Sequence, residues 1–365
     1  MDIYEIRENE EIVNYILIDS NGKPVIPVVK YLKFLKNNKA VNTLKTYCYH
    51  LKLYFEFLEQ KKVDYLEVDI NLLADFIGWL QNPRSTNILF HQKSKKKKRT
   101  AKTINLIMTP VLGFYDYLYR LEKTENRISD KVEKEIPVKN KGFKPFLYHL
   151  TQGDNEKKNL LKLKEHKKRI KILKNNDLNK IIDSCKNLRD LFLINLLYDT
   201  GLRIDEALSL WIEDFNISDK SIKVRKSKTR AGEGRTVYAS SETMNLFQDY
   251  LFEIHDGNGF DTNFVFVTLQ GKNRGEPLTY GSAKAMVDRL VEETGIKFTP
   301  HTLRHTFATE LHDEGVDIAI IQKLLGHEQV QTTISLYIHP SDETIRREYE
   351  KAQENKKRKE DDKFG

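Results

Sequence analysis

The hydrophobic and polar positions of the first 127 residues follow two different periods. Apolar residues alternate with polar ones before a turn at Asn21-Gly22, which predicts a β-hairpin over residues 1–27. Residues 28–127 instead carry four apolar stripes at helical spacing, one of which includes Leu51 and Phe55. Aromatic residues on such stripes are more often core than a platform for stacking bases, so a helical domain with an aromatic core is predicted. The hairpin is predicted to pack on this domain, with a DNA-contacting arm as the alternative.

The helical pattern breaks over residues 128–170. Proline and glycine interrupt it at Pro137, Gly142 and Pro145, and the stretch from Lys157 onward is dense in positive charge. A segment this long without periodicity is unusual inside a compact domain, so a basic linker between two domains is predicted. Such a linker could follow a DNA backbone or serve as a flexible strap.

Helical periodicity returns in residues 171–340, where one alternating stretch interrupts it. Ile222 and Val224 alternate with polar residues ahead of a glycine-rich turn at residues 232–234, which predicts a β-hairpin. This region is therefore predicted to be a mixed α+β domain, and the whole chain to be mainly α with a small β-sheet. Residues 341–365 are predicted to form a helix that ends in a charged tail.

The net charge of the chain indicates a class of binding partner. The 365 residues, 39% of them hydrophobic, suffice for two domains. The net charge of +8 and the pI near 9.0 favour a polyanionic partner such as nucleic acid. A basic run between the third and fourth predicted helices comprises Lys95, Lys96, Lys97, Lys98 and Arg99. Such a run is often only a solvated loop, but here it is predicted to contact DNA phosphates without reading sequence.

Cysteine usage and hydropathy exclude several classes of protein. Cys48 and Cys185 are far apart in sequence, which excludes a disulfide framework and a cysteine zinc site and fits a reducing compartment. The acidic amino terminus lacks an apolar core, so no secretory signal is predicted. No apolar run is long enough for a membrane span, so a cytoplasmic, nucleoid-associated bacterial protein is predicted.

Most of the candidate chemistry lies between His301 and Tyr337. His301 and Arg304 are three residues apart and share one face of a predicted helix. His327 follows the glycine that ends the next predicted helix. Two histidines and an arginine could therefore meet at one anion, with Tyr337 placed to attack it.

An earlier motif supplies a second arginine. In Gly201-Leu202-Arg203 the arginine opens a predicted helix and precedes Glu206 by three residues. Such a pair is either a surface ion pair of little value or an arginine held so that its fork faces a phosphate. The Gly-Leu-Arg-x-x-Glu pattern favours the second interpretation.

The order of these motifs resembles the tyrosine recombinase (phage integrase) family, most of all its transposon-encoded site-specific recombinases of the transposase A type. The chain matches the family signature at Thr200-Gly201-Leu202-Arg203, His301-Thr302-Leu303-Arg304, Leu325-Gly326-His327 and Tyr337. The four predicted helices resemble the family's core-binding domain by layout. His327 and Tyr337 are ten residues apart, where the family more often has nine. An extra residue between Thr332 and Leu336 would absorb the difference.

The resemblance implies a set of catalytic residues with Glu206 in support: Arg203, Lys228, His301, Arg304, His327 and Tyr337. Family members carry a catalytic lysine on a β-hairpin, which Lys228 matches, with Lys226 and Arg230 as rivals. The arginines would stabilise charge on the phosphate and the tyrosine would attack it. The lysine would protonate the departing 5′ oxygen, His301 would exchange the tyrosine's proton, and His327 would hydrogen-bond the phosphate.

The implied activity is site-specific recombination of double-stranded DNA through a 3′-phosphotyrosyl intermediate, for integration, excision or transposition of a mobile element. The covalent intermediate conserves the bond energy, so no ATP, metal or other cofactor is expected. Four strands must be cut and each chain offers one Tyr337, so a homotetramer on two duplexes is expected. Other proteins encoded by the element are candidate partners.

Other activities fit parts of the sequence. A chromosome-dimer-resolving recombinase and a type IB topoisomerase-like enzyme use similar chemistry. A metal-dependent hydrolase could use His301, His305 and His327, although the His-Glu-x-x-His pattern is absent. A DNA-binding regulator with a dead active site is a further alternative, which the intact set of candidate catalytic residues disfavours.

Overall fold

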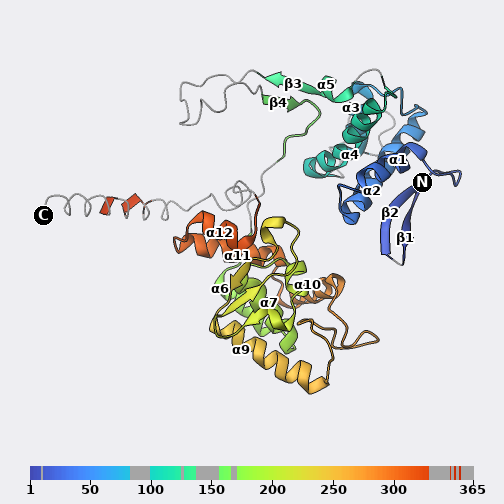
Figure 1. Cartoon of the computed structure of the whole chain (residues 1–365). Helices are drawn as coiled ribbons and strands as arrows, with labels where there is room; N and C mark the ends of the chain where they lie inside the picture. The colour runs from blue at the N-terminus through green and yellow to red at the C-terminus, as the bar shows by residue number, and fades with distance from the viewer. Residues whose placement is uncertain are drawn as a thin grey trace. The chain divides into compact units, whose positions relative to one another are not determined.

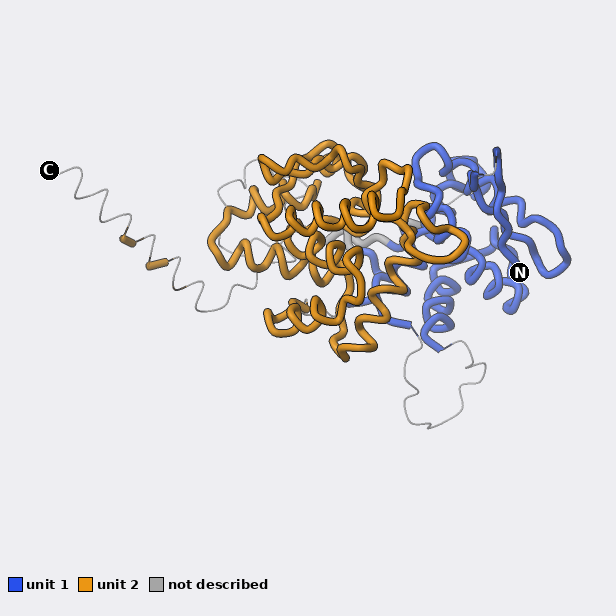
Figure 2. The backbone as a smooth tube through the Cα atoms, turned by 90° about the horizontal axis from the view of Figure 1, so that it is seen from below, with its two compact units in different colours: residues 1–167 blue, residues 168–365 orange. Residues whose placement is uncertain are grey.

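The protein divides into two compact units, residues 1–167 and 168–365 (Figure 2). Each unit has its own hydrophobic core. The computed structural model describes residues 1–9, 11–82, 99–124, 127–136, 156–165 and 171–328, together with residues 346, 349–350 and 353–354 of the tail.

Unit 1 is built around the four helices that the sequence predicts. Helix α2 contacts each of the others and strand β2. Aromatic side chains meet edge to face in the core, as Tyr54 does with Phe76 and Tyr115, which confirms that the aromatic stripes are core. The helices are α1 (Ile26–Leu35), α2 (Val41–Lys61), α3 (Ile70–Gln81) and α4 (Ala101–Arg120) (Figure 1).

The amino-terminal hairpin turns at a different place from the predicted one. Strands β1 (Asp2–Glu8) and β2 (Glu11–Ile18) pair antiparallel, and Asn9, with a φ of 49°, lies in the turn between them. The predicted turn at Asn21-Gly22 also forms, and it closes a single antiparallel bridge between Ile18 and Pro24 on the way from β2 to α1. Sequence reasoning misses the longer pairing of β1 with β2 because β1 is largely exposed, so its many charged residues hide its alternation.

Part of the predicted linker is folded onto unit 1. Helix α5 (Ile128–Val132) leads into strand β3 (Glu133–Ile136), which pairs with β4 (Glu156–Asn159). Beyond β4, the side-chain amide of Asn105 in α4 donates to the carbonyl of Leu163 over 3.0 Å and accepts from its N–H over 2.9 Å. The polar sequence predicts a plain linker because the residues that hold this segment lie far away in the chain.

Helix α7 is the central element of unit 2 and contacts α6, α8, α9 and α11. Strands β6 and β7 form the predicted hairpin, and β5 extends it to a small antiparallel sheet. Among the described helices, none combines the length and the apolar surface that crossing a bilayer requires. The elements are α6 (Asn175–Asp183), α7 (Leu188–Thr200), α8 (Ile204–Leu208), β5 (Phe215–Asn216), β6 (Ser221–Lys223), β7 (Thr236–Tyr238), α9 (Ser241–Tyr250), α10 (Tyr280–Thr294), α11 (Pro300–Asp313) and α12 (Ile318–Leu325).

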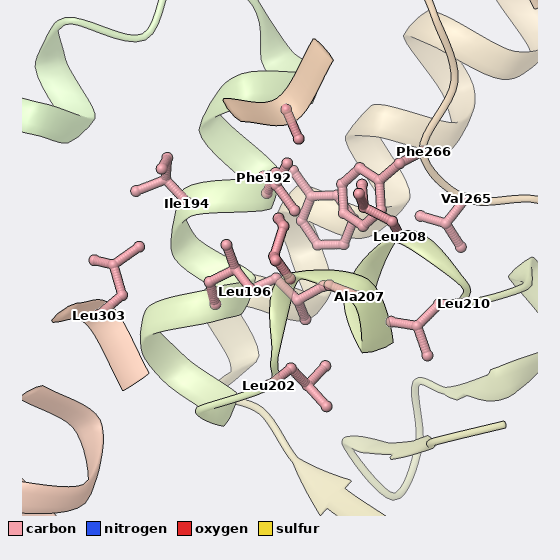
Figure 3. Close-up of a cluster of buried hydrophobic side chains, with 14 of the residues drawn as sticks. Phe192, Ile194, Leu196, Leu202, Ala207, Leu208, Leu210, Val265, Phe266 and Leu303 are labelled. Atoms are coloured by element: carbon pink, nitrogen blue, oxygen red, sulfur yellow. The ribbon is translucent and has the colours of Figure 1, made fainter. Parts of the chain in front are cut away.

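The core of unit 2 fixes the backbone at two arginines, Arg203 and Arg304. Figure 3 shows Leu202 beyond the end of α7 and Leu303 of α11 beside α7, and neither side chain is exposed. Leu202 precedes Arg203, and Leu303 precedes Arg304. A buried neighbour at each position locks the backbone from which the arginine projects.

Candidate active site

A glycine lets α7 end directly against α11. Gly201 caps α7 at a φ of 62°, and a Cβ built there would lie 2.3 Å from the ring of Phe307. The carbonyl of Gly201 accepts a hydrogen bond of 2.6 Å from Nη1 of Arg304. The motif Gly201-Leu202-Arg203 therefore brings the end of α7 to the helix that carries the second arginine.

Arg203 and Glu206 form the expected pair at the start of α8. Nη1 of Arg203 donates to Oε1 of Glu206 over 2.7 Å, and the backbone N–H of Arg203 donates to Oε2 over 3.0 Å. The glutamate thus also caps the helix. Its side chain is 2% exposed, whereas that of Arg203 is 17% exposed. The carboxylate therefore holds the guanidinium while part of it still faces solvent, where a phosphate could bind.

Arg304 is buried and ties α11 to the end of α12. Besides its bond to Gly201, its Nη2 donates to the carbonyl of Leu325 over 2.5 Å and contacts Nε2 of His327 over 3.0 Å. The end of a helix leaves such carbonyls without intrahelical partners, and the helix dipole favours positive charge there. These contacts fix the direction of the guanidinium.

Arg304 also sets the protonation state of His327. A guanidinium can only donate, so Nε2 of His327 accepts and the ring proton lies on Nδ1. Burial, and then the positive charges of Arg304 and Arg203, lower the pKa of His327 to about 4. His327 is therefore neutral at physiological pH, with Nδ1–H as its donor.

His301 lies in the first turn of α11 and is exposed. Partial burial lowers the pKa of its imidazole, and the charges of Arg304, Arg203 and Lys228 act in the same direction. The charges of Lys228 and of the two arginines that the sequence singles out therefore all act on His301.

The loop between β6 and β7 favours Lys228 over its rivals, Lys226 and Arg230. All three side chains are exposed. The neighbours of Lys228 on both sides are fixed to the site: Ser227 donates to the glutamate of the arginine pair over 2.6 Å, and Thr229 donates over 2.8 Å to the carbonyl that follows α12. The backbone of Lys228 is thereby held between two anchors.

A further buried arginine, Arg235, escapes sequence reasoning. It directly precedes β7, and its side chain is 5% exposed. Its guanidinium donates to both oxygens of Glu206, over 3.2 and 2.7 Å, and to the carbonyls of Gly232 and Leu324, over 2.7 and 2.8 Å. These partners lie in separate segments, so no local spacing marks the residue. One sequence signal could have identified Arg235: it is a charged residue directly before a strand whose inward-facing side chain is apolar.

Two predicted groups lie outside the described residues. Tyr337 falls in residues 329–340, and Lys95–Lys98 fall in residues 83–98. Only the end of the basic run is described: Nη1 of Arg99 donates to the carbonyl of Leu80 over 3.2 Å, which ties Arg99 to the end of α3. The nucleophile and the phosphate-contacting lysines stay predictions.

The histidines do not fit the metal-hydrolase alternative. The guanidinium of Arg304 occupies the lone pair of His327 Nε2 that a metal would need. Within the described residues, no group of three or more His, Cys, Asp or Glu side chains could hold an ion.

Related proteins cover almost the whole chain. Transposase A from transposon Tn554 of Staphylococcus aureus is 40% identical over 360 residues, which are 96% of this chain and 98% of that protein. Tyrosine recombinase XerA of Pyrococcus horikoshii is 26% identical over 347 residues, 95% of this chain and 97% of that protein.

Solved structures share the fold. The Tn1549 transposon integrase in complex with a circular intermediate DNA has a TM-score of 0.61 at 20% identity, covering 89% of this chain and 99% of that one. The XerH site-specific recombinase bound to a palindromic difH substrate has a TM-score of 0.60 at 20% identity, covering 88% and 82%.

Two family models match the chain, one in each half. Residues 28–122 match the phage integrase N-terminal SAM-like domain, and residues 171–344 match the phage integrase family. The second match contains the segments that place Arg203, Arg304 and His327 together. The resemblance seen in the sequence is thereby confirmed: the chain belongs to the phage integrase family of tyrosine recombinases, the enzymes that cut and rejoin DNA.

Proposed function

We propose that this chain is the site-specific recombinase of a mobile element and acts on double-stranded DNA through a bond between Tyr337 and a 3′ phosphate. The convergence of Arg203, Arg304 and His327 at the end of α12 carries the proposal. Donors that are already in place stabilise the negative charge that develops on a reacting phosphate. The 40% identity to the Tn554 transposase supports a role in transposition.

The proposed roles balance every proton of the cleavage step. The phenolic oxygen of Tyr337 attacks phosphorus while its proton passes to His301. The bond to the 5′ oxygen breaks, and Lys228 gives that oxygen a proton. The products are a 3′-phosphotyrosyl bond and a 5′ hydroxyl. Rejoining reverses these steps with the 5′ hydroxyl of another strand, so no ATP is consumed.

Cleavage is expected to persist in an excess of chelating agent, because arginine, lysine and histidine side chains provide the charge and the protons. The measurement is the yield of covalent protein–DNA adduct on a duplex nicked near the cleavage point, with and without chelator. A magnesium-dependent nuclease in the same buffer verifies that the chelation is complete. Loss of the adduct, restored by added zinc or magnesium, would overturn the proposed chemistry.

Neutralising the lysine run is expected to weaken binding to cognate and random duplex equally, because phosphate contacts carry no direct sequence information. Replacing Lys95–Lys98 by glutamine should make the slope of log affinity against log salt shallower, by about 0.9 for each lost contact. Lys61→Gln is the control, since that ammonium pairs with Asp75 at 3.6 Å. An unchanged slope in the lysine variant would mean that the run is a solvated loop.

A hollow on unit 2 supports the proposed assembly into a tetramer on two duplexes. Its volume is about 360 Å³, and apolar and acidic side chains both line it, among them Phe307, Leu311, Leu324, Asp199, Glu310 and Glu314. The tail at residues 341–365 carries the basic run Lys356–Lys359, and Tyr349 within it is exposed. Complementary charge and apolar surface suit the tail of one copy to the hollow of the next.

Deleting residues 341–365 is expected to impair strand exchange more than the binding of a single copy to DNA. Leu311→Glu, which places a charge in the hollow, should have the same effect in a chain that keeps its tail. A mixture of the two variants should recover part of the exchange, because each provides the surface that the other lacks. Exchange between two labelled duplexes and gel-shift titration measure the two activities. Full exchange by the truncated chain would contradict this assembly.

A further inference from the structure

Arg235 connects the segments that carry the candidate catalytic groups. Its guanidinium holds both carboxylate oxygens of Glu206, which in turn holds Arg203. Its Nε donates to the carbonyl of Leu324, three residues before His327. With its side chain 5% exposed, Arg235 offers almost no surface to DNA. Its influence on the site therefore passes through the residues that it holds and through its charge, which helps to lower the pKa of His327.

The packing around Arg235 leaves little freedom. Gly326 has a φ of 61°, and a Cβ built there would lie 2.6 Å from Cα of Gly232 and 3.1 Å from Nη1 of Arg235. The segment leading to His327 thus lies directly against the guanidinium and against the loop between β6 and β7. Because that loop also carries Lys228, a displaced Arg235 would disturb both candidate groups.

The charge of Arg235 has a separate effect. Glu206 faces Arg203 on its own helix, Arg235 before β7 and Arg304 on α11, the last at 3.9 Å. Burial raises the pKa of Glu206, but the hydrogen bonds and charge of Arg235, with the hydroxyl of Ser227 and the backbone of Arg203, outweigh burial and lower the pKa to about 2. Because Arg235 shares the carboxylate, Glu206 orients Arg203 without cancelling its charge.

We propose that Arg235 is a positioning residue for DNA cleavage, which sets Arg203 through Glu206 and sets His327 through the carbonyl of Leu324. This role rests on the function proposed above for Arg203 and His327. Arg235 touches neither the DNA nor the reacting atoms. Its loss should therefore slow the chemical step and leave the affinity for DNA unchanged.

The first test compares Arg235→Lys with Arg189→Lys in the full chain. Lysine keeps the charge but loses the planar fork. Arg189 is a matched control, because it is 12% exposed and binds Asp190 and the carbonyl of Val267 elsewhere in unit 2. Single-turnover cleavage of a nicked duplex, affinity for that duplex and thermal unfolding are measured. We expect Arg235→Lys to cleave about 100-fold more slowly, since small misplacement of catalytic groups has effects of this size. Arg189→Lys should keep the wild-type rate.

The second test asks whether the effect passes through Glu206. The double variant Arg235→Lys with Glu206→Gln should be little slower than the slower of the two single variants, because both changes break one network. In Arg235→Gln the pKa of Glu206 should rise, because burial still raises it while the positive charge of Arg235 no longer lowers it. Cleavage should be lost as the pH falls through that raised pKa, and adding Glu206→Gln should remove this dependence.

Several results would overturn the proposal. Arg235→Lys could cleave at the wild-type rate. Alternatively, unfolding and weaker DNA binding alone could account for the lower cleavage rate of Arg235→Lys. The effects of Arg235→Lys and Glu206→Gln could also be additive, which would place them in separate networks. If the wild-type chain itself forms no adduct, the proposed function is refuted, and the role of Arg235 falls with it.

Discussion

Tyr337→Phe is expected to abolish the covalent protein–DNA adduct while DNA binding survives. The change removes the oxygen that would form the phosphodiester, and a phenyl ring has no other nucleophilic atom. It removes little packing volume, so the fold should be retained. The measurement uses a suicide duplex with a nick near the cleavage point, followed by a denaturing gel and peptide mapping of the adduct. Gel-shift titration with the same duplex measures the affinity.

Tyr349→Phe is the matched control, because the chain has 17 tyrosines and Tyr349, the next one after Tyr337, is exposed. This variant should form the adduct normally. Buried tyrosines are poor candidates, since burial raises the pKa of Tyr54 and Tyr115 above the usual value and disfavours the phenolate. An adduct that persists in Tyr337→Phe would show that the ten-residue spacing from His327 accompanies a different nucleophile.

The parts of the site that sequence reasoning finds are those whose geometry is local. Arg203 and Glu206 are separated by less than one helical turn, so the helix start alone brings them together. His301 and Arg304 share a helix face for the same reason. The glycine at position 326 adopts the left-handed conformation that its place after a helix predicts.

The parts that sequence reasoning misses depend on distant segments. Arg235 binds a carboxylate 29 positions earlier and a carbonyl 89 positions later, and no periodicity encodes either contact. Asn105 holds Leu163 across 58 positions, which turns part of a predicted linker into packed structure. Such contacts arise only once separate helices are in place, so their energetic reason is tertiary.

The protonation state of His327 is another property that sequence alone does not provide. A histidine after a helix could be a cation, a general base or a neutral donor. The contact with Arg304 decides among these, since the guanidinium takes the Nε2 lone pair and its charge opposes a second proton. Any substitution of Arg304 should therefore alter two candidate catalytic groups at once, Arg304 itself and His327.

Arg304→Lys is expected to lower the cleavage rate by about 1,000-fold, the size of effect seen when a donor to a developing oxyanion is lost. Lysine keeps the positive charge but cannot direct donors at the same time toward Gly201, Leu325 and His327. His327 also loses the contact that fixes its proton on Nδ1. Single-turnover adduct formation on the suicide duplex measures the rate.

The control for Arg304→Lys must separate chemistry from stability, because each buried carbonyl left unpaired costs about 1–3 kcal/mol. Thr306→Val is a suitable control. Thr306 lies on the same helix, and its hydroxyl accepts a hydrogen bond of 2.9 Å from the N–H of Leu173, which is not a candidate catalytic residue. Both variants should unfold at a lower temperature than the wild type. Well below those temperatures, Thr306→Val should cleave normally and Arg304→Lys should not. Equal cleavage by the two would mean that Arg304 only supports the fold and that Arg203 stabilises the phosphate without it.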